Sequence, residues 1–439
     1  MYEFYPFQRP ICVICNVRNV QDAILYIPDS NSRISWAVEE ILVRRAGLKI
    51  RFAVDEADFI SASAEIKIHY TRKELPGNRI YRSGFLDENG ISQGFIPGSA
   101  RINGLFCLFP DNQEQQFDLF AMVFWCLSRY EEYSLFSADK HGRFPSTASL
   151  LYSWGVLEEP VCDIAISAMF AQWGLTVQQN FSIIPTLDID IAFAYAGRGW
   201  LRSLGAALKN PLSLSQRLKS MANPELDPNF SFPYIQKALK NNPNARIFWH
   251  CGAQNNRYDK QVSLDFKPLL AAIKNMDNGM QCGLHPSFAA FKDENILLKE
   301  KQFLERTLNR QVTESRMHYI LLSFPRTYRS LLHAGITHDY SMGYPDTPGF
   351  RAGTAHPFTW YDLNAEQSTN LQVHPFCIMD ATSRHYLQQK PEQAMGAGNL
   401  LKAIIREHGG NFCFIFHNES LGKQAEWRGW DTVFKAWME

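Results

Sequence analysis

Residues 181–190, FSIIPTLDID, decide the fold, because an apolar run of the kind found in a buried strand ends there in two carboxylates, Asp188 and Asp190. From this run onward the sequence alternates strand-like and helix-like segments, which predicts βαβ units built around a parallel sheet. Further strands are expected at 246–249, 280–284, 315–320, 337–340, 370–378 and 411–416, and helices at about 229–240, 263–276, 293–310, 325–333 and 390–408.

The alternating part, residues 181–439, has the length of a (β/α) barrel with seven or eight units. Residues 1–180 differ, because short strand-like runs mix there with helical patterns and a polar, turn-rich segment at 138–149. The sequence therefore predicts an α/β protein with an N-terminal mixed α/β domain, 1–180, and a C-terminal barrel, 181–439. We find no chemistry in the N-terminal domain and expect it to pack beside the barrel mouth and shape a cleft.

Charge and composition exclude several classes of partner. The 439 residues include 44 Lys and Arg against 44 Asp and Glu, so the formal net charge is zero and nothing favours a nucleic-acid partner. The nine cysteines lie mostly in apolar runs, which favours reduced thiols; only Cys12 and Cys15 have CxxC spacing. We find no signal peptide and no apolar run of membrane-spanning length, so we expect a cytoplasmic protein without a transmembrane segment.

Side chains that could carry chemistry stand at the ends of the expected strands. His285 follows one strand, Arg316 and His318 lie in the next, and His417 ends the last. The C-terminal ends of parallel strands meet at one edge, so these groups should approach the paired carboxylates. A carboxylate with imidazoles from different strands suits Zn²⁺ or a similar ion. With a second carboxylate as general base and another histidine as general acid, metal-assisted hydrolysis is the reaction class that fits best.

Four short motifs carry a resemblance to a known family. TLDID at 186–190 resembles the TFDDG motif of the polysaccharide deacetylases, the NodB-homology domain of carbohydrate esterase family 4. GLHPS at 283–287 resembles the start of that family's metal-binding H[ST]xxH motif. SRMHY at 315–319 stands where its arginine motif falls, and FIFH at 414–417 resembles its closing histidine motif. The resemblance covers about residues 181–420 and is closest to a divergent bacterial branch with an extra N-terminal domain.

The resemblance implies a distorted (β/α) barrel and a metal-dependent hydrolase, with zinc as the best match for the metal. Its substrate would be a carbohydrate or glycan precursor from which an N- or O-acetyl group is removed. Residue by residue, the resemblance implies Asp188 as catalytic base, Arg316 as the group that orients it and His417 as general acid. It also implies Asp190 and His285 as metal ligands.

The chain departs from the family at Ala289, where the family has its second metal-binding histidine. His318 is our first candidate for the missing ligand and His250, which ends the 246–249 strand, is the second. Two further residues are candidates for substrate binding. Arg351 could hold an anionic group of the substrate or anchor a loop through an ion pair, and Asp380 could contact substrate or cap the next helix.

Two other functions stay open at this point. The alanine at position 289 also fits a catalytically impaired, carbohydrate-binding member of the same fold. Asp188-Ile189-Asp190 after an apolar strand also matches the DxD pattern with which glycosyltransferases hold Mn²⁺ and a nucleotide sugar. That second alternative does not need His285 or His417 at strand ends. Because nothing directs export, a lipid-linked saccharide or small sugar conjugate is a better candidate substrate than a finished wall polymer.

Overall fold

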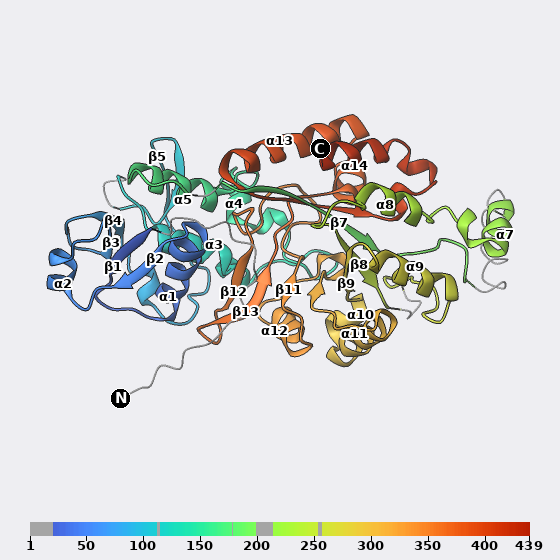
Figure 1. Ribbon diagram of the computed structural model, residues 1–439, viewed down its shortest axis with the longest axis horizontal. Coiled ribbons are helices and arrows are strands. Elements are labelled where there is room, and N and C mark those ends of the chain that lie inside the picture. The colour runs from blue at the N-terminus through green and yellow to red at the C-terminus, as the bar shows by residue number, and fades with distance from the viewer. Residues whose placement is uncertain (1–20, 112–114, 178, 199–213, 253–256) are drawn as a thin grey trace.

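Two sheets organise the chain, one formed by residues near the N-terminus and one by the C-terminal part (Figure 1). The structure is a computed structural model that describes residues 21–111, 115–177, 179–198, 214–252 and 257–439. The Cys12 and Cys15 pair lies outside these described residues. The α/β class expected from the sequence is confirmed.

The N-terminal sheet has four parallel strands in the order β2-β1-β3-β4. Its strands are β1 (Asp22–Tyr26), β2 (Lys49–Phe52), β3 (Ile66–Thr71) and β4 (Asn78–Tyr81), and a separate hairpin follows, β5 (Ser99–Ile102) with β6 (Leu105–Leu108). The helices of this part are α1 (Ser32–Val38), continued by a π-helical segment (Glu39–Arg45), α2 (Glu56–Ser61), α3 (Leu119–Leu127), α4 (Leu150–Ser153) and α5 (Val161–Gln172). α3 is buried along its whole length, which explains why its sequence is apolar on every face.

The C-terminal sheet has nine strands in the order β12-β13-β11-β10-β9-β8-β7-β15-β14, and only the β12–β13 pair is antiparallel. Its strands are β7 (Phe181–Ile189), β8 (Arg246–His250), β9 (Gln281–His285), β10 (Glu314–Ser315), β11 (His338–Asp339), β12 (Phe358–Asp362), β13 (Gln367–Val373), β14 (Ile378–Met379) and β15 (Gly410–His417). β10 and β11 are much shorter than the sequence suggests, because the chain turns away directly after Ser315 and Asp339.

The sheet curls around a small core of its own. Phe248 of β8, Tyr340 after β11 and Met379 of β14 belong to one buried cluster, although their strands are well separated in the sheet order. Side chains of such distant strands can meet only if the sheet bends strongly, as a barrel does. No ladder joins β12 to β14 among the residues that the structure describes, so the closed barrel of seven or eight units predicted from the sequence is not shown.

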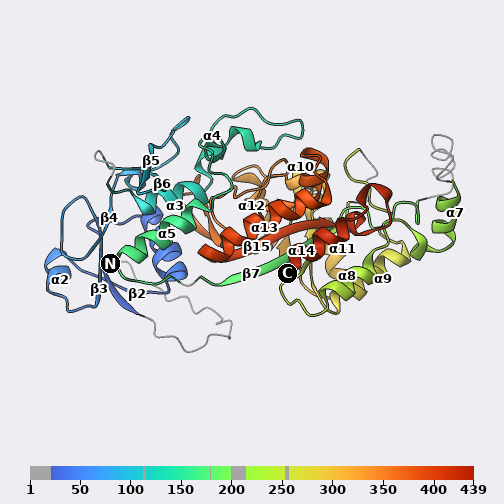
Figure 2. The same cartoon turned by 90° about the horizontal axis from the view of Figure 1, so that it is seen from above.

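Helices flank the curled sheet on both sides in Figure 1. α13 (Pro391–His408), α14 (Trp430–Met438) and α8 (Phe232–Leu239) lie above it, and α9 (Lys267–Asp277), α10 (Phe288–Lys292), α11 (Glu294–Leu308) and α12 (Arg326–His333) lie below, whereas α7 (Leu214–Ala222) projects at one end. Figure 2, seen from above, shows α13 and α14 over β15. Trp437 of α14 packs on Phe414 with ring centroids 5.5 Å apart, so the aromatic residues near the C-terminus belong to the core.

The N-terminal part packs against the β12 edge of the large sheet. The indole N–H of Trp36 donates to the carbonyl of Thr359 at 3.0 Å, and the rings of Phe124 and Tyr361 lie 5.0 Å apart. One hydrophobic core runs through both parts. Among the described residues no helix has both the length and the apolar character needed to cross a membrane.

Candidate metal centre and active site

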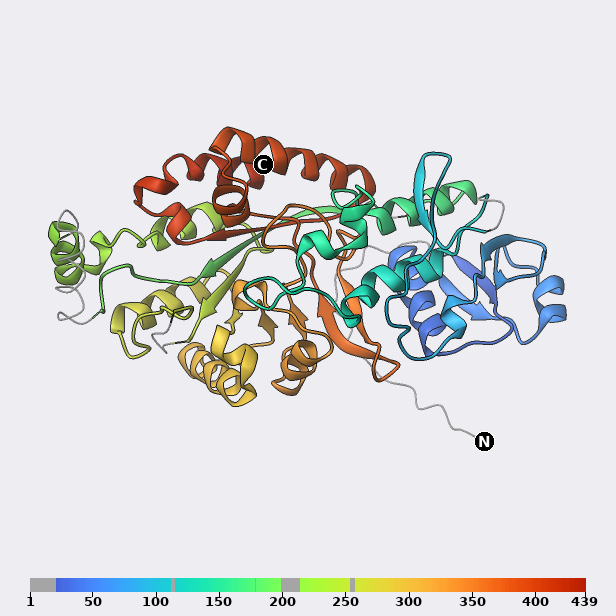
Figure 3. The ribbon, with the colours of Figure 1, turned by 180° about the vertical axis from the view of Figure 1, so that it is seen from behind.

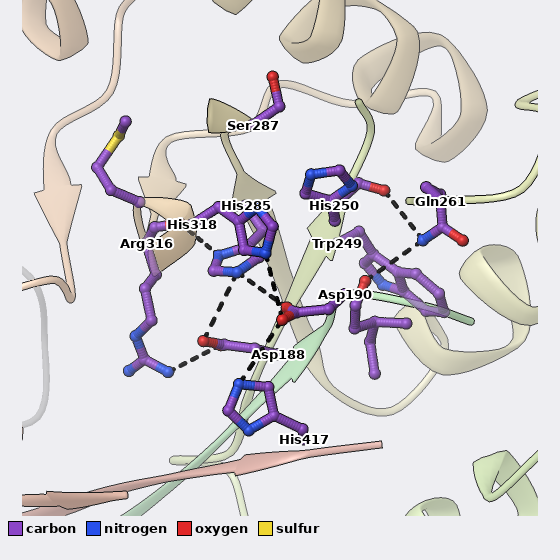
Figure 4. Close-up of polar contacts among 12 residues, drawn as sticks. Asp188, Asp190, Trp249, His250, Gln261, His285, Ser287, Arg316, His318 and His417 are labelled. Carbon is purple, nitrogen blue, oxygen red and sulfur yellow. Dashed lines mark hydrogen bonds and ion pairs between the residues drawn. The ribbon is translucent and has the colours of Figure 1, made fainter. Parts of the chain in front are cut away.

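The ends of β7, β9, β15 and the short β10 bring the candidate side chains together, as Figure 4 shows. β7 carries Asp188 at its end with Asp190 just beyond it, and the β7–β15 ladder places His417 opposite Asp188. β9 ends at His285, and Arg316 and His318 follow β10. Parallel strands thus deliver their polar ends to one edge of the sheet, as expected from the sequence.

Three of these residues form a group that could hold a metal ion. The donor atoms of Asp190, His285 and His318 all lie within 4.8 Å of one another. His285 Nε2 is 3.1 Å from Asp190 Oδ1, and His318 Nε2 is 3.3 Å from Asp190 Oδ2. Asp190 therefore offers one oxygen to each imidazole, and all three side chains converge on one point.

The orientation of the His285 ring shows which of its atoms could contact a cation. Its Nδ1 lies 2.6 Å from the carbonyl oxygen of Arg316, which can only accept a hydrogen bond, so Nδ1 must donate. In the neutral ring Nε2 then carries a lone pair, and it faces Asp190 Oδ1, a buried oxygen without a hydrogen bond among the described residues. A proton or a metal ion between these two atoms relieves their repulsion, and one carboxylate with two imidazoles is a donor set that suits a divalent ion such as zinc.

His318 is held in place by a second buried carboxylate, Asp259. Asp259 Oδ1 lies 3.3 Å from His318 Nδ1 and 3.2 Å from His250 Nε2, while the backbone N–H groups of Phe288 and Ala289 donate to the same carboxylate. Burial alone would lower the pKa of His318, but the negative charge of Asp190 outweighs it and raises that pKa to about 9. The position attracts positive charge, and Asp259 turns Nε2 of His318 toward Asp190.

Asp188 lies beside this group and is oriented by a buried arginine. Arg316 Nη1 donates to Asp188 Oδ1 at 2.9 Å and to the hydroxyl of Thr186 at 2.7 Å, and its Nε donates to the carbonyl of Tyr340 at 3.0 Å. Asp188 Oδ2 lies 3.8 Å from His285 Nε2. One carboxylate oxygen is thus fixed by the guanidinium, and the other is directed toward the proposed metal ligands.

His417 stands on another side of the same point and is oriented by Asp380. Its Nδ1 lies 2.7 Å from Asp380 Oδ1 and its backbone N–H donates to Asp380 Oδ2 at 2.8 Å, so Nε2 is left to face Asp190 Oδ2 at 3.8 Å. Burial by itself lowers the pKa of an imidazole, but the charges of Asp380 and Asp190 outweigh it and hold the pKa of His417 well above its usual 6.5. The raised pKa favours the protonated form of His417, and in that form the ring can give up a proton from Nε2.

These side chains open into a pocket of about 200 Å³. Its lining consists of Arg143, Asp188, Asp190, His285, His318, Tyr319, Ile320, Pro345, Met379, Ala381, His385, Tyr386, His417 and Glu419. Burial raises the pKa of Glu419 to about 7, so a further titratable group stands next to His417. A larger hollow of about 670 Å³ around Trp427 contains neither the metal-ligand group nor Asp188, so we place the chemistry in the smaller pocket.

The structure brings five of the residues singled out from the sequence to the lining of this pocket: Asp188, Asp190, His285, His318 and His417. The sixth, Arg316, is buried behind Asp188 and reaches the pocket only through that carboxylate. Asp380 supports His417 from behind. Arg351 is placed elsewhere: it is buried in an ion pair with Glu132 and lies outside the pocket lining, as the loop-anchoring alternative expects. His250 touches Asp259, one layer behind His318, and Ala289 contributes only its backbone N–H.

Sequence reasoning missed three residues at the site, Asp259, Arg143 and Glu419. Asp259 and Arg143 lie in loops far from the recognised motifs, so no local pattern marks them. Glu419 stands two residues after His417, and that position directly after a strand end was a signal that could have identified it.

The chain is similar to one protein family and to several solved structures. A family of unknown function, DUF7033, matches residues 23–173. No curated protein matches the chain. Similar solved structures include a provisionally assigned polysaccharide deacetylase from Mycobacterium smegmatis (16% identity, 58% of this chain and 84% of that chain, TM-score 0.37) and an allantoinase (13%, 59% and 83%, 0.36). A 4-alpha-glucanotransferase from Thermococcus litoralis is also similar (12%, 60% and 37%, 0.35). Likeness at this level leaves the function to be argued from the site.

Proposed function

We propose that this chain is a metal-dependent hydrolase that removes an N- or O-acetyl group from a carbohydrate or glycan precursor. The observation that supports it most is the arrangement around Asp190. Three metal donors converge there, a carboxylate held by Arg316 lies on one side and an imidazole held by Asp380 lies on another. Metal-assisted hydrolysis of an acyl group uses a general base, a general acid and a Lewis acid in one pocket.

Asp190, His285 and His318 would hold the metal, with zinc as the proposed ion. When bound, such an ion polarises the acyl carbonyl and makes water a better nucleophile. Asp188 would accept the proton of the attacking water at Oδ2, because Oδ1 is occupied by Arg316. His417 would deliver its Nε2 proton to the leaving nitrogen or oxygen, and its hydrogen bond to Asp380 keeps the ring turned for that transfer.

The alternatives are less well supported by the geometry. In a DxD glycosyltransferase both carboxylates would serve the metal and the nucleotide sugar, but Asp188 is engaged by a buried guanidinium. Imidazole ligands also suit zinc better than Mn²⁺, which favours carboxylate and water oxygens. A catalytically impaired binding protein was suggested by Ala289, and His318 stands within the donor group to compensate for that residue.

The proposal is tested by metal analysis and acetate release. Purified full-length protein should retain about one Zn²⁺ per chain, and metal-loaded protein should release acetate from N-acetylglucosamine oligomers. Chelation should abolish release and added Zn²⁺ should restore it. Protein that binds no divalent ion, or loaded protein that releases no acyl group from any acetylated sugar in such a panel, would refute the proposal.

The charge of Asp380 predicts a pH effect. His417 acts in its protonated form, and Asp380 raises the pKa of that imidazole, so activity should persist to alkaline pH and fall only as His417 loses its proton. Asp380→Asn removes the negative charge and lowers the pKa of His417, so the alkaline limb of kcat/KM should move to lower pH by about one unit or more. Asp431→Asn, at an exposed ion pair of α14, is the matched control and should leave the profile in place. An unmoved limb in Asp380→Asn would show that His417 is not the acid.

A further inference from the structure

Arg143, a residue of the N-terminal part, joins two sides of the pocket. Its Nη1 donates to the carbonyl of Tyr319 at 2.8 Å, and its Nη2 lies 3.2 Å from the hydroxyl of Tyr386. Tyr319 follows β10 and Tyr386 follows β14, and four strands separate β10 from β14 in the sheet order. One buried guanidinium therefore spans the mouth of the curled sheet.

Hydrogen bonds within the loop and to the C-terminal part hold the segment that carries Arg143 in place. Asp139 accepts hydrogen bonds from the backbone N–H of His141 and of Arg143, and its other oxygen lies 2.7 Å from Arg143 Nε. Ser146 donates to Asp346 at 2.8 Å, next to Pro345 in the pocket lining. Loop residues 134–149 are thus attached beside the pocket, and Figure 3 shows this teal segment reaching from the N-terminal part over the C-terminal one.

Aromatic rings pack beside residues 134–149 and, together with Arg143, form one wall of the pocket. His141 packs on Tyr319 and Tyr258, with ring centroids 5.0 Å and 5.9 Å apart, and Tyr258 stacks on Phe288 at 4.1 Å. Tyr319 and the following Ile320 have φ values of 59° and 55°, a conformation that is unfavourable for a β-branched side chain. The surroundings must hold this turn in place, and Arg143 does so directly at the carbonyl of Tyr319.

We infer that residues 134–149 close one side of the active-site pocket, so that the pocket admits a single sugar ring. The substrate is then a chain end or a small conjugate, not the interior of a polymer. The inference rests on the proposed function and goes beyond it by naming the substrate class. A pocket of about 200 Å³ is smaller than the roughly 300–1,000 Å³ that holds larger ligands. A polymer threading past the metal ligands would need the space that Arg143 and the Tyr319 turn occupy.

Binding and product analysis test this directly. Metal-loaded Asp188→Asn protein is titrated by calorimetry with N-acetylglucosamine oligomers of one, three and six rings, and the wild-type products are sequenced by mass spectrometry. We expect the affinity to change less than about threefold with length and acetyl loss only at one end ring. Affinity that rises steadily with length, loss of interior acetyl groups, or no binding of any oligomer would overturn the inference. Binding independent of length without acetyl release by the wild type would refute only the proposed hydrolysis.

The Arg143→Met variant lacks the guanidinium that contacts Tyr319 and Tyr386, and it is tested in the same assays. The variant should remove interior acetyl groups and bind six rings at least about tenfold more tightly than one, while its zinc content shows that the His318 position survives. Tyr386→Phe, which deletes one hydroxyl at the rim, should change the product pattern in the same direction with less disturbance of the fold. Arg101→Met, at an exposed arginine of the N-terminal part, is the matched control. If a folded, zinc-loaded Arg143→Met protein still removed acetyl groups only from one end ring, the inference about residues 134–149 would be wrong.

Discussion

Asp188→Asn is expected to lower kcat by about 10²–10⁴-fold, the usual contribution of a general base, and to leave the zinc content unchanged. The amide keeps the shape of the carboxyl group, and its oxygen can still accept the hydrogen bond from Arg316 at the position of Oδ1. What is lost is the ability of the second oxygen to take a proton from water. KM should change little, because this group is proposed to act in the chemical step and not in holding the sugar. Acetate release under saturating substrate, with metal analysis of the same samples, measures both quantities.

The control for Asp188→Asn must be another buried aspartate paired with an arginine. Asp163 meets this need, because it is fully buried, lies 2.6 Å from Arg45 Nη1 and stands outside the pocket lining. Asp163→Asn should lower the free energy of unfolding and spare kcat in the folded fraction. If Asp188→Asn retained near wild-type kcat, or if it lost zinc, Asp188 would be a structural or ligand residue and the proposed division of roles between Asp188 and Asp190 would be wrong.

Much of the site could be predicted because strand ends in a parallel sheet converge. Asp188, Asp190, His285 and His417 each end or follow a strand that the apolar pattern identifies, so their approach follows from topology alone. The roles proposed for them also needed the resemblance to polysaccharide deacetylases, and the distances between the side chains suit those roles. The structure agrees with the predicted barrel only in part: the strands are mostly parallel, but no ladder closes the sheet among the described residues. The pattern of alternating elements predicts parallel units, but it does not show that β12 runs antiparallel at the sheet edge.

The remaining features depend on contacts that no local pattern records. His318 approaches Asp190 because the chain leaves β10 after two residues and turns at Tyr319, whose positive φ has no signal in the sequence. Asp259 comes from a loop without any recognised motif. Arg143 belongs to a segment that its polar composition marks only as a surface loop, and the burial of its guanidinium becomes evident only when both parts of the chain are folded together. That the N-terminal part shapes the cleft stays a prediction, and Arg143 is the residue through which it can be tested.

His318→Ala should weaken zinc binding by more than about 100-fold, because it removes one of three proposed ligands, which should cost more than the 10–100-fold typical of losing a supporting residue. His250→Ala is the decisive comparison. The same residue type is removed from a position one layer behind, and both imidazoles contact the same Asp259 oxygen. His250, Asp259 and His318 also form a second group whose atoms lie close enough to hold an ion, so the two variants separate two locations for the metal.

If the ion lies among Asp190, His285 and His318, His250→Ala should weaken zinc binding by less than about tenfold, since Asp259 keeps the backbone donors of Phe288 and Ala289 and can still orient His318. If the ion instead lies between His250 and His318, both variants should lose zinc to a similar extent and His285→Ala should spare it. Competition with a chromophoric chelator measures all three affinities. Equal losses in His318→Ala and His250→Ala would move the metal away from Asp188 and His417, and the hydrolytic arrangement proposed around Asp190 would fail with it.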